Sequence, residues 1–173
     1  MGTTLRYPES VARLDSSSKP LLKAWIPAVL WMGVIAVEST DWLSAHHTGR
    51  LLYPILHYLF GVIPESFETW HFLIRKGGHV FGYAMLSWLL FRAWRATLPM
   101  VDKRGRTLRW AGMAVGMTTL VASLDEWHQT FIPSRTGTPH DVLLDTVAGV
   151  SAQVLILLCL LPGNRRAGTD THQ

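Results

Sequence analysis

The stretch Val142–Leu161 reads VLLDTVAGVSAQVLILLCLL and decides the fold class, because its twenty residues include a single acid, Asp145. About twenty apolar residues, each rising 1.5 Å, span the hydrocarbon core of a bilayer. A surface helix of a soluble protein would carry a polar face along its whole length. The stretch therefore predicts a transmembrane helix, and a soluble helical protein is the weaker alternative.

Three further apolar blocks precede it: Leu21–Val37, Val80–Trp94 and Trp110–Leu124. The last two have fifteen residues each and cover about 22 Å of a core about 30 Å thick, so they need polar end residues at interfacial depth or a thinner bilayer. Charged residues make up 16% of the chain, below the usual share of roughly a quarter. We expect an all-α membrane protein built as a four-transmembrane-helix bundle.

The basic residues indicate the topology. With four spans, twelve of the sixteen Lys and Arg residues fall in the N-terminal arm, the loop between the second and third spans, and the C-terminal tail. The positive-inside rule then places both termini in the cytoplasm. We expect a cytoplasmic arm over residues 1–20, a membrane domain over 21–162 and a cytoplasmic tail over 163–173. The basic residues are then topology signals and contacts for anionic lipid, and no nucleic-acid partner is expected.

One apolar segment on the outer side is too broken to span. Leu51–Ile63 contains Pro54, His57 and Gly61, so it predicts an outer interfacial or re-entrant helical segment. Glu65–Arg75 then forms an amphipathic lead-in to the second span.

The second span opens with a polar stripe. Lys76, His79 and Tyr83 share one helix face at positions i, i+3 and i+7. A cation, an imidazole and a phenol are unfavourable in contact with lipid, so the stripe should face the bundle interior. The alternative to a functional role is a satisfied hydrogen-bond network between helices.

The third span ends in Asp125, Glu126, His128 and Gln129. Two carboxylates beside an apolar helix are costly to desolvate. We therefore expect Lys76 or Arg135 within salt-bridge distance of one of them. The alternative is a hydrated helix end.

The loop that follows contains Arg135, whose planar guanidinium suits a carboxylate or a phosphate. Thr138 or Pro139 begins the last helix, which puts Asp141 in the first turn, where a capping role is the alternative. Asp145 lies one turn deeper on the same face, and an ionisable residue at that depth is a functional hypothesis.

Glycines are available for close packing of the helices at Gly77, Gly78, Gly82, Gly112, Gly116 and Gly149. Helix association in a bilayer needs little more than such small residues and a few hydrogen bonds. The ionisable residues at one leaflet therefore exceed what packing requires.

The ordered series Arg75–His79 with Tyr83, Asp125–Gln129, Pro133–Arg135 and Asp141–Asp145 with Gly149 resembles the VanZ-like family of small bacterial membrane proteins. The resemblance covers residues 21–161. It implies a multi-pass protein of the bacterial inner membrane with a role in the cell envelope, since the family is named from a protein linked to teicoplanin resistance. The chain departs from the usual family pattern in having Asp145 for Asn and Ser134 for Gly.

We expect the protein to bind or process an anionic or lipid-linked amphiphile at the outer leaflet, such as an envelope precursor or a lipoglycopeptide. The candidate catalytic residues are His79, Asp125, Glu126 and Asp145. The candidate binding residues are Lys76, Tyr83, His128, Gln129, Arg135 and Asp141. No cofactor is predicted, because no local ligand spacing is present, although the acids and histidines leave a divalent metal as an alternative. A small lipid or ion transporter and a non-catalytic partner-binding protein are the other function classes.

Overall fold

The computed structural model describes residues 9–98 and 103–160, and every regular element in them is helical. In chain order these are α1 (Glu9–Glu38), the short 3₁₀ helix η1 (Asp41–Leu43), α2 (Ala45–Phe60), α3 (Pro64–Thr97), α4 (Lys103–Gln129) and α5 (Pro139–Leu160). The prediction of an all-α chain is confirmed for this part. Residues 1–8 of the expected arm and the expected tail, 163–173, lie outside the described residues.

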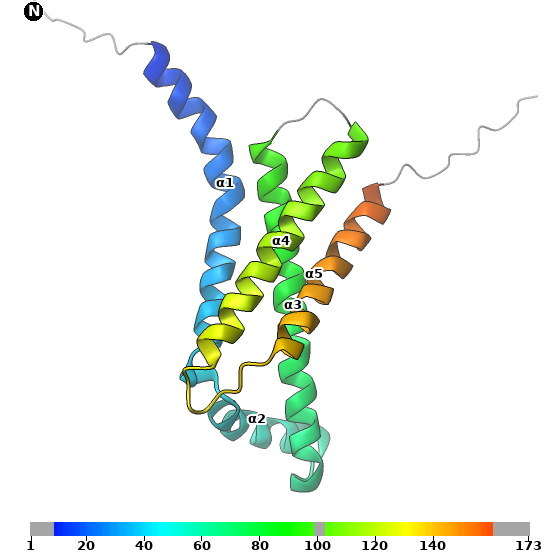
Figure 1. The fold of residues 1–173 in the computed structure, drawn as a ribbon. Helices are drawn as coiled ribbons and strands as arrows, with labels where there is room; N and C mark the ends of the chain where they lie inside the picture. Colours follow the sequence, from blue (N-terminus) through cyan, green and yellow to red (C-terminus); the bar gives the residue numbers. More distant parts are fainter. Residues whose placement is uncertain (1–8, 99–102, 161–173) are drawn as a thin grey trace, which may run out of the picture.

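Helices α1, α3, α4 and α5 form a bundle in which α3 contacts the other three (Figure 1). The start of α1, the end of α3, the start of α4 and the end of α5 lie at one end of it (Figure 1). The opposite helix termini lie beside α2, and we call this the α2 end. Successive long helices therefore run in opposite directions, as four membrane crossings would require.

Two of the described helices are long and apolar enough to cross a membrane, namely residues Pro20–Glu38 of α1 and the whole of α5. The two shorter apolar blocks lie inside α3 and α4, which do not meet the same test, so four crossings stay a prediction. Large apolar side chains are exposed along both candidate spans, as at Leu30, 66% exposed, and Leu155, 63% exposed. Such surfaces are uncommon on soluble monomers and fit contact with lipid.

Helix α3 joins the expected lead-in and the second span into one element of 34 residues. Pro64 occupies its first turn, where the missing N–H costs nothing. At 1.5 Å per residue the helix is about 51 Å long, well beyond a hydrocarbon core of about 30 Å. Its first turns therefore extend past the bundle at the α2 end, where they contact α2 (Figure 1).

Helix α2 lies across the end of the bundle (Figure 1). It ends at Gly61, whose φ of 66° is left-handed and whose N–H donates to the His57 carbonyl at 2.9 Å. Glycine adopts this conformation without steric cost, so the helix stops there. Apolar and aromatic side chains stay exposed along it, as at Leu51, 72%, and Tyr58, 86%. This placement favours the interfacial interpretation over a re-entrant one.

The core follows the inward face of α3, where Tyr83, Leu86 and Leu90 are buried. A Cβ added to Gly149 of α5 would lie 2.9 Å from the Thr118 side chain of α4, so this glycine does allow close packing. The prediction of close helix packing is wrong for the other five glycines, which are Gly77, Gly78, Gly82, Gly112 and Gly116. A Cβ on any of them would meet nothing within 4 Å.

Candidate functional site

The polar stripe of α3 faces the bundle, as expected, because each of its side chains contacts an acid on another helix. The Lys76 ammonium pairs with Asp141 of α5, and the His79 Nδ1 lies 3.5 Å from the Asp145 Oδ2. The Tyr83 hydroxyl donates to the Asp125 Oδ2 of α4 at 3.0 Å. Three helices are therefore joined at the α2 end by residues one turn apart.

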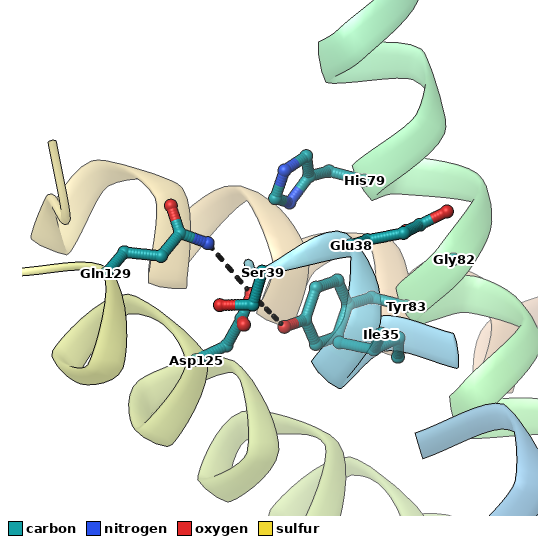
Figure 2. Close-up of a pocket in the computed structure, with 8 residues that line it drawn as sticks. All are labelled: Ile35, Glu38, Ser39, His79, Gly82, Tyr83, Asp125 and Gln129. Carbon is teal, nitrogen blue, oxygen red and sulfur yellow. Dashed lines mark hydrogen bonds between the residues drawn. The ribbon is translucent and has the colours of Figure 1, made fainter. Parts of the chain in front are cut away.

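A narrow cavity of about 10 Å³ lies beside Asp125, between α1, α3 and α4. Figure 2 shows the Asp125 carboxylate between the Tyr83 hydroxyl and the Gln129 amide, which donates to the same oxygen at 3.2 Å. His79 of α3 and Ser39 at the end of α1 also line this space (Figure 2). The cavity is near the size that holds one water molecule.

A wide pocket of about 310 Å³ lies next to it at the α2 end. Its lining includes the cations Arg75, Lys76 and Arg135, the Asp141 carboxylate, and His79 and Gln129. His79 and Gln129 line the narrow cavity as well. These two side chains therefore separate the wide pocket from the buried acid Asp125.

Arg135 has a structural role besides lining the wide pocket. Its Nη2 donates to the backbone carbonyls of Glu38 and Thr40, at the C-terminal end of α1. This contact satisfies carbonyls that a helix end leaves unpaired, and it suits the negative end of the helix dipole. Burial and the nearby Arg75 lower the pKa of the Arg135 guanidinium from its ordinary value, yet arginine stays charged in proteins.

His79, Glu126 and Asp145 form a cluster, which we call the carboxylate cluster, with one residue from each of α3, α4 and α5. Glu126 and Asp145 are buried, and His79 is half-buried. One donor atom of each lies within 4.8 Å of the other two. The Glu126 Oε2 accepts the Thr138 N–H at 2.9 Å. The Glu126 Oε1 and both Asp145 oxygens have no hydrogen-bond partner among the described residues.

The loop before α5 lies directly against this cluster. A Cβ on Gly137 would come 2.1 Å from the Glu126 backbone carbonyl and 2.9 Å from the Thr130 side chain. Only glycine fits there without movement of the backbone, and this close approach brings the neighbouring Thr138 N–H to Glu126. Pro139 begins α5, as one of the two expected starts.

The expected salt bridge from Lys76 or Arg135 to Asp125 or Glu126 is wrong, since none is present among the described residues. Both cations have other partners: Lys76 pairs with Asp141, and Arg135 donates to the end of α1. The buried acids receive neutral donors instead, a phenol and an amide at Asp125 and a backbone N–H at Glu126.

The structure brings together nine of the ten candidate residues, all but His128. His128 is exposed and lines neither the wide pocket nor the narrow cavity. Its Nδ1 lies 3.2 Å from the hydroxyl of Ser39, the residue that follows α1. Sequence reasoning missed Arg75 and His71, which both line the wide pocket. Their spacing was a usable signal, because His71, Arg75 and His79 recur every four residues on one helix face.

No curated protein and no solved structure matches the chain. A family model described as VanZ/LLP1 matches residues 24–160, from the apolar part of α1 to the last residue of α5. The match includes every residue of the wide pocket, the narrow cavity and the carboxylate cluster. The chain therefore belongs to the VanZ/LLP1 family.

Proposed function

We propose that this protein crosses the bacterial inner membrane four times, with both termini in the cytoplasm, and binds the anionic headgroup of an amphiphile at the outer leaflet. The observation that carries the proposal is the wide pocket of about 310 Å³, with three cations in its lining at the end of an apolar bundle. Ligand sites of this kind have volumes of about 300–1,000 Å³ and place a few polar groups in fixed positions.

The charges of the pocket favour an anion. Within the described residues only Lys76 of the three cations has an ion-pair partner, Asp141. Burial lowers the pKa of Arg75, and the Asp141 carboxylate partly offsets that effect. Burial and then the positive charge of Arg75 lower the pKa of Arg135, so the two cations lie close enough for Arg75 to repel Arg135. A phosphate or carboxylate between them would offset this repulsion and accept paired N–H donors.

The surroundings favour an amphiphile over a free anion. Phe72 lines the pocket and is 59% exposed, and its neighbour Leu73 is 53% exposed. The exposed apolar side chains of α2 lie at the same end of the bundle. Such side chains suit the boundary between headgroups and acyl chains. A bound headgroup could therefore keep its apolar tail in the bilayer beside α2 and α3.

We further propose that the site processes the bound headgroup. His79 lines both the wide pocket and the narrow cavity, so its ring can exchange a proton with a group held by Arg75 and Lys76. Asp125, Glu126 and Asp145 lie near the His79 ring and can hold or position that proton. A lipid-linked envelope precursor or a lipoglycopeptide has suitable anionic groups, which would connect the site to glycopeptide susceptibility.

The test uses the full chain purified in detergent, with dihexanoyl phosphatidic acid titrated by calorimetry. We expect saturable binding that is at least tenfold weaker in Arg75→Gln and unchanged in Arg95→Gln. Arg95 is a matched control, exposed near the opposite end of the same helix. Dihexanoyl phosphatidylcholine, as a zwitterionic control, and inorganic phosphate should bind more weakly.

Equal binding of the two lipids, or no effect of Arg75→Gln, would overturn the binding proposal. Tighter binding of inorganic phosphate than of the lipid would replace an amphiphile with a free anion. The processing step is tested by monitoring release of the headgroup with mass spectrometry. Lipid that stays intact after prolonged incubation would show that the protein binds the headgroup without processing it.

A further inference from the structure

We propose that His79, Glu126 and Asp145 bind one divalent transition-metal ion between α3, α4 and α5. With an ion bound, Glu126 and Asp145 would hold that ion in place of the proton that the proposed processing step assigns to them. The metal proposal does not rest on the proposed anion binding, because its ligands are the carboxylate cluster and not the cations that line the wide pocket. It would hold even if the pocket bound no anion.

The arrangement of donor atoms fits an ion. The three donors, an imidazole nitrogen and two carboxylate oxygens, all lie within 4.8 Å of one another. Two ligands of a tetrahedral zinc ion, each about 2.0–2.2 Å from it, are about 3.3–3.6 Å apart, and the His79 Nδ1 and the Asp145 Oδ2 already lie 3.5 Å apart. A movement of the Glu126 side chain by about 1 Å would bring all three donors into range. One imidazole and two carboxylates suit zinc or manganese better than magnesium or calcium, which prefer oxygen ligands alone.

The unpaired carboxylate oxygens of Asp145 and Glu126 are a second, independent observation in favour of a bound ion. Asp145 is fully buried, and neither of its carboxylate oxygens has a hydrogen-bond partner among the described residues. Glu126 is 4% exposed, and its Oε1 is likewise unpaired. The His79 Nδ1 lies 3.5 Å from the Asp145 Oδ2, too far for a normal hydrogen bond. Buried carboxylate oxygens without partners are expensive, and a cation between them would remove that cost.

Groups around the carboxylate cluster orient the proposed ligands and leave a route by which an ion can reach them. The Thr138 N–H holds the second Glu126 oxygen at 2.9 Å, which leaves Oε1 directed elsewhere. Outer contacts of this type orient metal ligands in known sites. His79 also lines the wide pocket, so an ion can enter from the α2 end. Three protein ligands leave at least one position open for water or for a ligand oxygen.

The competing explanation is a shared proton, in which Asp145 is neutral or His79 is protonated and no metal binds. The two explanations differ in a direct measurement. The full chain, with any affinity tag removed, is purified in detergent, treated with EDTA and dialysed to equilibrium against Zn²⁺ or Mn²⁺. We expect one ion per chain. Less than half an ion per chain for both metals would overturn the proposal and favour the shared proton.

Substitutions assign the ligands. Asp145→Asn, Glu126→Gln and His79→Gln should each weaken Zn²⁺ binding at least tenfold. His140→Gln and Glu65→Gln should bind as the wild type does, because both residues are exposed and lie outside the cluster. Unchanged affinity in the three cluster variants would place the ion elsewhere and overturn the proposal.

A measurement on the wild type alone keeps the test decisive where a cluster variant does not fold. With Mn²⁺ bound, electron spin-echo modulation should show the nitrogen of a single imidazole. Loss of this signal in His79→Gln, with the signal kept in His140→Gln, assigns the histidine. A Mn²⁺ complex of the wild type without nitrogen modulation would overturn the proposal.

Discussion

Two buried polar regions of the bundle differ in how their groups are paired. About two-thirds of the way along α3, the Gln153 amide of α5 donates to the Ser87 hydroxyl at 2.8 Å and to the Ser87 carbonyl at 2.9 Å. The Ser87 hydroxyl in turn donates to the Gly149 carbonyl at 3.0 Å. These groups are neutral, and only the Gln153 Oε1 lacks a partner among the described residues. At the α2 end, by contrast, the carboxylate cluster is ionisable and leaves three oxygens unpaired.

The difference indicates that helix packing alone does not require the carboxylate cluster. The Ser87–Gln153 contact, with the close approach at Gly149, joins α3 to α5 without any ionisable group. Burying the acids at the α2 end costs more free energy than burying such a neutral contact, and the carboxylate cluster forms fewer hydrogen bonds. This comparison favours a role in binding or chemistry at the α2 end.

The largest expected effect concerns the side of the membrane on which the α2 end lies. In a Cys159→Ser background, a cysteine at Ser134 should react fully with an impermeant maleimide in spheroplasts, and one at Lys103 should not. Ser134 is exposed in the loop before α5. Reaction at Lys103 alone would reverse the topology and place the cluster in the cytoplasm. Reaction at both positions would mean that only α1 and α5 cross.

A second prediction separates function from packing at the α2 end. Glu126→Gln and Asp125→Asn should lower activity by about 100-fold or more, as loss of an acid or base does, while folded protein stays near the normal yield. Each amide keeps one oxygen that can accept the existing donors, namely the Thr138 N–H at Glu126 and the Tyr83 hydroxyl at Asp125. Glycopeptide susceptibility or lipid turnover reports activity, and size-exclusion chromatography reports folding.

Glu65→Gln is the control for that pair, because Glu65 is exposed in the first turn of α3. Full activity of both variants would show that the two acids have no role in function. Failure of both to fold, with normal Glu65→Gln, would mean that the acids serve mainly to hold the helices together.

The helical fold was predictable because apolar blocks and breakers act locally. Val142–Leu161 and Leu21–Val37 correspond to the two helices that can cross a membrane, and Gly61 ends α2 as a breaker should. The continuity of α3 from Pro64 to Thr97 was not predictable from apolar length alone. The amphipathic residues 65–76 keep the helical spacing but precede the apolar block that predicts the second span.

The site was predictable as a group of residues but not as a set of contacts. The stripe of Lys76, His79 and Tyr83 follows from helical spacing, so its inward direction was foreseen. Pairing between helices depends on register, which no spacing within one segment fixes. The partner of Lys76 is therefore Asp141 and not the expected acid on α4. The carboxylate cluster takes one residue from each of three helices, so it leaves no local metal-ligand motif.

The smallest expected effect lies in the middle of the bundle. Ser87→Ala, Gln153→Ala and the double variant, unfolded in mixed micelles, should give a coupling free energy of about 0.6 kcal/mol, the average for hydrogen bonds between membrane helices. Activity should be unchanged in all three. Ser151→Ala is the matched control, since Ser151 is exposed and donates only to the Val147 carbonyl of its own helix, so it should show no coupling to Gln153→Ala. A loss of activity without a loss of stability would mean that the middle of the bundle also serves function, and the contrast with the α2 end would then fail.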